Sequence, residues 1–217
     1  MVELIRDLDA ATVRENLAAV EARLAAAGRK PGEVQILAAV KYLPESELAA
    51  LARGGVTLVG ENRAQALLQK APLHPEVTWD FIGALQSRKV AQIVPHVRLI
   101  HSVASESALS QLAKHGTPQT RILLEVNVAD DPDKEGIRPK DLPAFIARSP
   151  VKVVGLMTMP PLTDDPERSR PHFAALRELA AAHDLPELSM GTSQDYGVAV
   201  EEGATIIRLG TTLYQRR

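Results

Sequence analysis

Hydrophobic residues first follow a helical period along the chain and then fall into short runs. Val13, Leu17 and Val20 recur every three or four residues, which predicts an amphipathic helix. Asp9 is a suitable N-cap for this helix, and Gly28 is a suitable residue to end it. We therefore expect one helix to precede the first strand.

Eight short apolar or β-branched runs follow this helix, separated by segments rich in Ala, Leu, Glu and Arg that are typical of amphipathic helices. Continuous apolar runs, rather than strict alternation, are typical of strands that are buried on both faces of a parallel sheet. The predicted strands are residues 34–41, 56–62, 77–83, 97–103, 121–128, 151–157, 187–190 and 204–210.

Eight alternating strand and helix units predict an α/β fold, a (β/α)₈ TIM barrel with an extra N-terminal helix. No break in composition divides the runs, so we expect a single domain over residues 1–217. A doubly wound open sheet is the alternative architecture.

Composition excludes several classes of function. The net charge of −2 and the 3% aromatic content do not favour a nucleic-acid or anionic-membrane surface. The chain has no cysteine, which excludes disulfides and thiolate chemistry. The charged start of the sequence does not resemble a signal peptide, and no apolar run approaches the roughly 20 residues that span a bilayer. We expect a cytoplasmic protein.

Polar residues gather where the predicted strands end, which is the end at which TIM barrels carry their sites. Lys41 directly follows an apolar run. Burial of its charge would be costly, so Lys41 is either an edge residue that reaches solvent or a lysine with a chemical task. The polar residues at strand ends are Lys41, Glu61, Asn62, His101, Ser102, Asn127 and Arg208.

The segments after the last two predicted strands, "MGTSQD" and "GTT", suit an anion. Gly191 and Gly210 allow close approach of the backbone, and Ser193 and Thr211 offer hydroxyl groups. The alternative for Ser193 is that it caps a helix, with Asp195 near the positive helix end. Two such segments in the two expected places favour a phosphate site.

A lysine on one side of the barrel mouth and a phosphate site on the other suggest a phosphorylated carbonyl compound, because lysines form Schiff bases. Pyridoxal 5′-phosphate (PLP) and a phosphosugar aldol intermediate both fit. Arg208 distinguishes them, because a guanidinium only donates hydrogen bonds. Facing a pyridine nitrogen, it would leave that nitrogen unprotonated, whereas a sugar needs no such partner.

The motifs "AAVKY", "GENRAQ", "FIGALQSRK", "HSV", "DKEGI", "GLMTM", "LSMGTSQD" and "RLGTTLY" occur in this order along the chain. Their order and spacing resemble the YggS/PROSC family of pyridoxal phosphate homeostasis proteins over nearly the whole sequence. The resemblance implies a barrel similar to the N-terminal domain of alanine racemase, with PLP held as a Schiff base on Lys41.

The same resemblance assigns further residues to the cofactor. Asn62 resembles a neighbour of the cofactor, and Arg208 resembles the arginine that faces the pyridine nitrogen. His101 and Met157 match motif positions near the pocket. The phosphate contacts are implied for Ser193, Gly210 and Thr211.

Two functional classes share such a barrel. A racemase needs a second acid or base on the face opposite Lys41, and Tyr42, Tyr196 and Tyr214 cannot be placed there from the sequence. A carrier needs only a lysine, a phosphate site and access. We therefore expect a PLP homeostasis protein without robust turnover, with PLP-dependent apoenzymes as candidate recipients. We also expect a monomer without a metal, with racemase and phosphosugar aldolase activities as alternatives.

Overall fold

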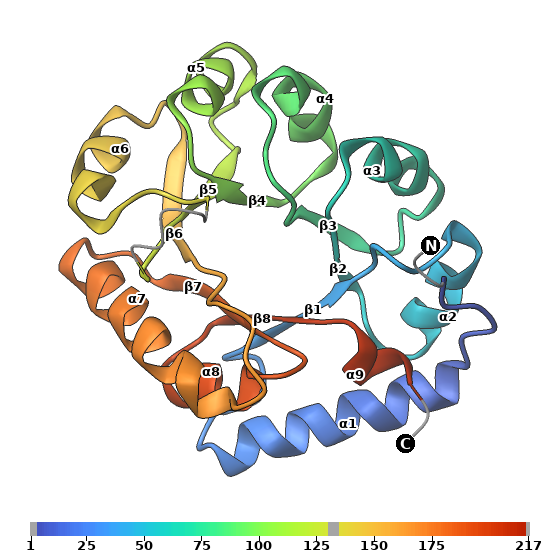
Figure 1. Ribbon diagram of the computed structural model, residues 1–217. Coiled ribbons are helices and arrows are strands. Elements are labelled where there is room, and N and C mark those ends of the chain that lie inside the picture. The colour runs from blue at the N-terminus through green and yellow to red at the C-terminus, as the bar shows by residue number, and fades with distance from the viewer. Residues whose placement is uncertain (1–3, 130–134, 216–217) are drawn as a thin grey trace.

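The computed structural model, which describes residues 4–129 and 135–215, is a closed barrel of eight parallel strands (Figure 1). The strands are β1 (Gln35–Ala39), β2 (Leu58–Glu61), β3 (Thr78–Phe81), β4 (Leu99–Val103), β5 (Arg121–Glu125), β6 (Lys152–Met157), β7 (Glu187–Thr192) and β8 (Ile206–Leu209). Each strand pairs with the next, and β8 closes the barrel against β1, with Arg208 beside Leu37. The predicted barrel is confirmed, and the open sheet is wrong because β1 and β8 are neighbours.

Helices surround the strands as an outer ring (Figure 1). They return the chain to the start of the next parallel strand, as a right-handed crossover requires. The α-helices are α1 (Ala10–Ala26), α2 (Leu48–Arg53), α3 (Ala64–Lys70), α4 (Val90–Ile93), α5 (Glu106–His115), α6 (Leu142–Arg148), α7 (Arg170–Ala182), α8 (Tyr196–Glu201) and α9 (Thr211–Tyr214).

The predicted N-terminal helix is α1, and it lies outside the ring against α2, α8 and α9 (Figure 1). The Asp9 carboxylate caps it by accepting a hydrogen bond from the Ala11 amide at 3.1 Å. The Asn16 side chain donates to the carbonyl oxygens of Leu213 and Gln215 at 3.2 and 2.9 Å. Helix α1 therefore holds the short helix that follows β8.

Strand residues alternate between two apolar layers. Ala38 and Ile207 pack outward against the helices, whereas Leu37 and Ile206 belong to a separate cluster that fills the barrel interior. Gly60 faces this interior, where an added Cβ would lie 2.5 Å from Leu37 Cδ2. Truncation of a buried leucine such as Leu37 costs about 2–5 kcal/mol in comparable cores. The interior is thus packed rather than open.

Strand β1 ends two residues before Lys41, earlier than the predicted run of residues 34–41. Val40 still donates its amide to Gly60 O at 3.0 Å, but its carbonyl accepts from the Leu43 amide at 3.1 Å. The second bond turns the chain, because a strand carbonyl would pair across the sheet. Lys41 therefore lies in a turn at the barrel rim.

No helix within residues 4–129 and 135–215 is long and apolar enough to cross a membrane. The same residues contain no group of three His, Asp or Glu side chains placed to hold a metal ion.

Candidate functional site

A cavity of about 350 Å³ opens at the carboxyl ends of the strands. Residues at the ends of all eight strands line it, which is the arrangement expected of a barrel site. Among the residues named from the sequence, those that line the cavity are Lys41, Asn62, Ser102, Met157, Ser193, Arg208, Gly210 and Thr211. Glu61, His101 and Asn127 do not line it.

Lys41 is exposed and contributes to the cavity wall from the turn after β1. Its ammonium nitrogen lies 4.6 Å from the centre of the Tyr42 ring, within the range of a cation–π contact. The turn is anchored by the Ile5 amide, which donates to Tyr42 O at 2.9 Å, and by Tyr214 Oη, which donates to Ala39 O at 3.1 Å. The predicted edge position of Lys41 is thus compatible with a chemical task.

A buried ion pair lies behind this turn. Glu61 is 1% exposed, and its Oε2 lies 2.7 Å from the ammonium of Lys70 at the end of α3. Lys70 also donates to Val40 O at 3.0 Å, immediately before Lys41. Glu61 Oε1 accepts from the backbone amides of Asn62 and Arg63 at 2.7 and 3.2 Å. The pair therefore ties the Lys41 turn to the Asn62 turn.

Sequence reasoning missed Lys70, because it ends an ordinary helical pattern. The available signal was Glu61, a carboxylate at the end of an apolar run that requires a buried donor.

Asn62 reaches the cavity from the turn after β2. Its backbone is packed closely, since an added Cβ on Gly83 would lie 1.9 Å from Asn62 O. Its side-chain oxygen Oδ1 is buried and has no hydrogen-bond partner within the described part of the chain. Such an acceptor is costly to leave unpaired, which marks this wall of the cavity as suited to a ligand that donates a hydrogen bond.

The two predicted phosphate segments meet at the cavity. Gly191 adopts a φ of +90° at the end of β7, a conformation that favours glycine. Ser193 Oγ accepts hydrogen bonds from the backbone amides of Gly210 and Thr212, at 3.1 and 3.5 Å. Because Ser193 Oγ accepts from these amides, its own hydrogen can donate into the cavity, which Ser193 and Thr211 both line.

The capping alternative is wrong for α8, but Ser193 Oγ accepts from the Gly210 and Thr212 amides at the N-terminus of α9 and so caps that helix instead. Helix α8 begins after Asp195, whose carboxylate instead accepts from the Thr192 amide at 2.7 Å and from Ser169 Oγ at 2.9 Å. Asp195 thus braces the segment while Ser193 faces the β8 end.

Arg208 projects from β8 towards the cavity and is 6% exposed. Its Nη1 donates to Ser189 O and Ser189 Oγ at 2.7 and 2.6 Å, and its Nη2 donates to Thr158 O at 3.0 Å and to Met159 Sδ at 2.9 Å. Burial lowers the pKa of Arg208 to about 10, while Glu125 and Asp195 act in the opposite direction. The guanidinium is therefore charged at neutral pH, and Nε–H is the donor left without a partner among the residues that the structure describes.

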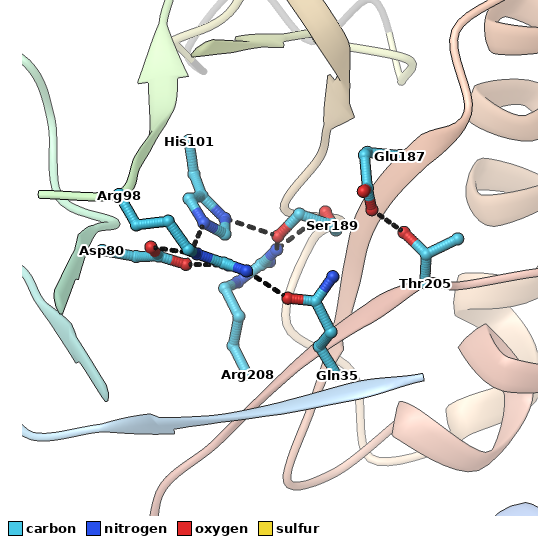
Figure 2. Close-up of polar contacts among 8 residues, drawn as sticks. All are labelled: Gln35, Asp80, Arg98, His101, Glu187, Ser189, Thr205 and Arg208. Atoms are coloured by element: carbon cyan, nitrogen blue, oxygen red, sulfur yellow. Dashed lines mark hydrogen bonds and ion pairs between the residues drawn. The ribbon is translucent and has the colours of Figure 1, made fainter. Parts of the chain in front are cut away.

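His101 and Met157 occupy different positions relative to the cavity. Met157 lines it from the apolar barrel interior. His101 is fully buried, with Nδ1 2.8 Å from Ser189 Oγ and Nε2 3.1 Å from Asp80 Oδ2 (Figure 2). His101 therefore reaches the cavity through Ser189 and Arg208 rather than directly.

Glu125, which the sequence analysis did not single out, lines the cavity from the end of β5. Burial raises the pKa of the Glu125 carboxyl, whereas the charge of Arg208 lowers it and that of Glu135 raises it. A glutamate inside the run "ILLEVNV" was the available signal.

The chain matches the family model of the alanine racemase N-terminal domain over residues 8–217. Among curated relatives, it is 39% identical to the pyridoxal phosphate homeostasis protein of Aquifex aeolicus, over 88% of this chain and 90% of that protein. It is 36% identical to the protein of the same name from Pseudomonas aeruginosa, over 95% and 96% of the two chains.

Solved structures of proteins from the same family and fold are also similar to this chain. PipY of Synechococcus elongatus, solved with and without PLP, is similar with a TM-score of 0.81 and 32% identity, over 94% of this chain and 100% of that one. Alanine racemase of Corynebacterium glutamicum has a TM-score of 0.78 at 14% identity, over 100% of this chain and 64% of that one. The latter match concerns the fold alone, and it confirms the predicted similarity to the alanine racemase barrel.

Proposed function

We propose that this chain, which belongs to the family of pyridoxal phosphate homeostasis proteins, binds PLP in the cavity at the barrel mouth and holds it as a Schiff base on Lys41. One observation carries the proposal: Lys41, the two hydroxyl residues Ser193 and Thr211, and Arg208 all line the same cavity. PipY, a relative at 32% identity, has been solved with PLP bound.

The residues at the cavity suit the chemical groups of PLP. The volume of about 350 Å³ lies within the usual range for small-ligand sites. The unpaired Asn62 Oδ1 can accept a hydrogen bond from a ligand hydroxyl group. The hydroxyls of Ser193 and Thr211 can donate to a phosphate, and Arg208 can donate to a ring nitrogen.

Each residue has a separate role in this proposal. PLP, when bound, supplies an aldehyde that condenses reversibly with primary amines. Lys41 provides the amine, and its exposure gives incoming amines access to the same position. Arg208 only donates hydrogen bonds, so a pyridine nitrogen beside it would accept without taking a proton. An unprotonated ring withdraws electrons weakly, which favours holding the aldehyde over amino-acid turnover.

The positions of the tyrosines support a carrier over a racemase. Tyr42 adjoins Lys41 in the same turn, and Tyr214 donates its hydroxyl to Ala39 O on the β1 side of the cavity. Burial raises the pKa of Tyr214, with a further contribution from the charge of Glu61, so its proton is held tightly. Tyr196 does not line the cavity and lies beside Arg23 instead. None of these three residues therefore supplies a proton acceptor facing Lys41 across the cavity.

The proposed carrier releases PLP to PLP-dependent apoenzymes and acts as a monomer. The open, exposed position of Lys41 supports release, because an amine from another protein can reach the same carbon.

Absorption spectroscopy and borohydride reduction test the Lys41 assignment. We expect protein loaded with PLP to absorb in the visible range, and borohydride to bleach it and fix the label on Lys41. Lys41→Ala should remove both signals, whereas Lys114→Ala, which changes an exposed lysine of α5, should leave them intact. A label on another lysine, or a Lys41→Ala protein with unchanged absorbance, would contradict the proposal.

A second assay separates carrier from racemase. Loaded protein should restore activity to an apoenzyme that requires PLP, and it should not racemise alanine or serine. Racemisation that disappears in Lys41→Ala would contradict the carrier function while leaving the binding proposal intact.

A further inference from the structure

A column of hydrogen-bonded polar side chains, buried from Asp80 to Arg208, crosses the barrel interior (Figure 2). It begins with Arg98, directly before β4, and passes through Asp80 on β3 and His101 on β4 to Ser189 on β7 and Arg208 on β8. Asp80, His101 and Ser189 are each 0% exposed. An interior of this kind is normally filled with branched apolar residues, so the four connected polar residues that are buried there require an explanation.

We propose that Asp80, His101 and Ser189 are positioning residues that determine the orientation of the Arg208 guanidinium at the cavity. In each hydrogen bond of the column, the group that donates is determined by the preceding hydrogen bond. The consequence for PLP rests on the function proposed above, whereas the direction of the hydrogen bonds does not.

The direction is set first at Asp80. Arg98 donates to both carboxylate oxygens, from Nε at 3.0 Å and from Nη2 at 2.6 Å, and its Nη1 donates to Gln35 Oε1. A carboxylate paired with a guanidinium in this way is ionised and can only accept hydrogen bonds. The nitrogen of His101 that faces Asp80 is Nε2, at 3.1 Å, so Nε2 carries the hydrogen.

The second step is the neutral state of the imidazole. Burial lowers the pKa of His101, Asp80 opposes this effect, and the charges of Arg208 and Arg98 lower the pKa further. A neutral ring with hydrogen on Nε2 has a bare Nδ1. Ser189 Oγ lies 2.8 Å from Nδ1, so the Ser189 hydroxyl donates to it.

The last step is Arg208. Because the hydroxyl hydrogen of Ser189 points to His101, its lone pairs are free to accept from Arg208 Nη1 at 2.6 Å. The carbonyl oxygen of the same residue accepts from Nη1 at 2.7 Å, so Ser189 holds one guanidinium nitrogen at two points. Nη2 is held by Thr158 O and Met159 Sδ, which leaves Nε–H for a ligand. The orientation of Arg208 therefore depends in part on Ser189, which does not line the cavity, and through Ser189 on His101 and Asp80.

Nitrogen NMR of the protein without PLP tests the direction of the hydrogen bonds along the column. Wild type should show hydrogen on His101 Nε2 and a bare Nδ1 at pH 7.5. In Asp80→Asn, the new amide can donate to Nε2, and we expect the hydrogen to move to Nδ1, where it competes with Arg208 for Ser189. Asp141→Asn is the matched control, because Asp141 is a partly exposed carboxylate outside the column that also pairs with an arginine. Wild-type hydrogen on Nδ1, or on both nitrogens, would overturn the proposal.

The Ser189→Ala variant removes one atom, the hydroxyl oxygen, and tests whether Ser189 positions Arg208. It keeps the proposal testable even if Asp80→Asn does not fold. We expect faster exchange of the Arg208 guanidinium hydrogens in the protein without PLP. In the loaded protein, we expect a shifted absorption maximum and PLP release faster by about tenfold, the effect of one hydrogen bond to a charged group. Ser189→Thr keeps the hydroxyl and should restore the wild-type values.

The exchange experiment and the PLP-binding experiment have distinct negative results. Unchanged Arg208 exchange in Ser189→Ala would overturn positioning, even if PLP binds normally. Failure of wild-type protein to bind PLP would overturn the proposed function, while the Arg208 and His101 signals would still decide whether the column positions the guanidinium.

Discussion

Lys41 and Lys70 lie close to the same turn of the backbone but in opposite environments. Lys41 is exposed at the cavity and has a tyrosine ring as its neighbour. Lys70 is 8% exposed, pairs with Glu61, and donates to the carbonyl of Val40, the residue before Lys41. The buried lysine is part of the scaffold, whereas the exposed lysine is the one proposed to react with PLP.

This difference teaches that burial alone does not identify a reactive lysine. A buried ammonium with two good acceptors is satisfied and has no free position for chemistry. Lys70 and Glu61 instead hold the two turns that place Lys41 and Asn62 at the cavity. Substitutions at the two lysines should therefore separate stability from ligand chemistry.

The largest effect on stability is expected for Lys70→Met. Removal of the ammonium leaves the Glu61 carboxylate buried without its ion-pair partner, which typically costs about 3–5 kcal/mol. Urea unfolding should show a correspondingly lower midpoint. Lys114→Met, an exposed position on α5, is the control. A loss below about 1 kcal/mol would mean that the pair is not a structural element.

Glu61→Gln should have a smaller effect. The amide oxygen can still accept from the backbone amides of Asn62 and Arg63, and Lys70 keeps its bond to Val40 O. Loss of the charge partner should cost about 1–3 kcal/mol in the free energy of unfolding. Combined with Lys70→Met, the double variant should be more stable than the sum of the single losses predicts. Strict additivity would argue against coupling between the two residues.

Tyr214→Phe tests the other anchor of the Lys41 segment. It removes the hydrogen bond from Tyr214 Oη to Ala39 O and keeps the buried ring, so we expect a loss of about 1 kcal/mol in unfolding free energy. Borohydride labelling of Lys41 should persist in this variant. If labelling disappeared while the protein stayed folded, Tyr214 would have a role in the ligand chemistry itself.

Lys41→Ala should have the smallest effect on stability, within about 0.5 kcal/mol, because the side chain is exposed and its contact with Tyr42 is weak at such a site. The same variant should lose all borohydride labelling. A large loss of unfolding free energy, measured with urea, would mean that Lys41 is part of the scaffold, as Lys70 is.

The positions of the predicted site residues could be found from the sequence to different degrees. Lys41, Asn62 and Arg208 follow apolar runs, and parallel strands bring their carboxyl ends to one rim. His101 faces the same barrel interior as Arg208, but it lies deeper, beside Asp80, and does not line the cavity. How deep an inward-facing residue lies depends on the register of its strand against the neighbouring strands, which the apolar run alone does not give.

The order of apolar runs and intervening helices was sufficient to determine the barrel, because local hydrophobic periodicity is written directly in the sequence. It also determined that polar groups collect at one rim. Only the tertiary structure decided that Glu61 pairs with Lys70, and that Asp80, His101 and Ser189 join into one column. The first contact depends on how α3 packs back onto the end of β2, and the column depends on which strands face one another across the closed barrel, so no local pattern in the chain records either.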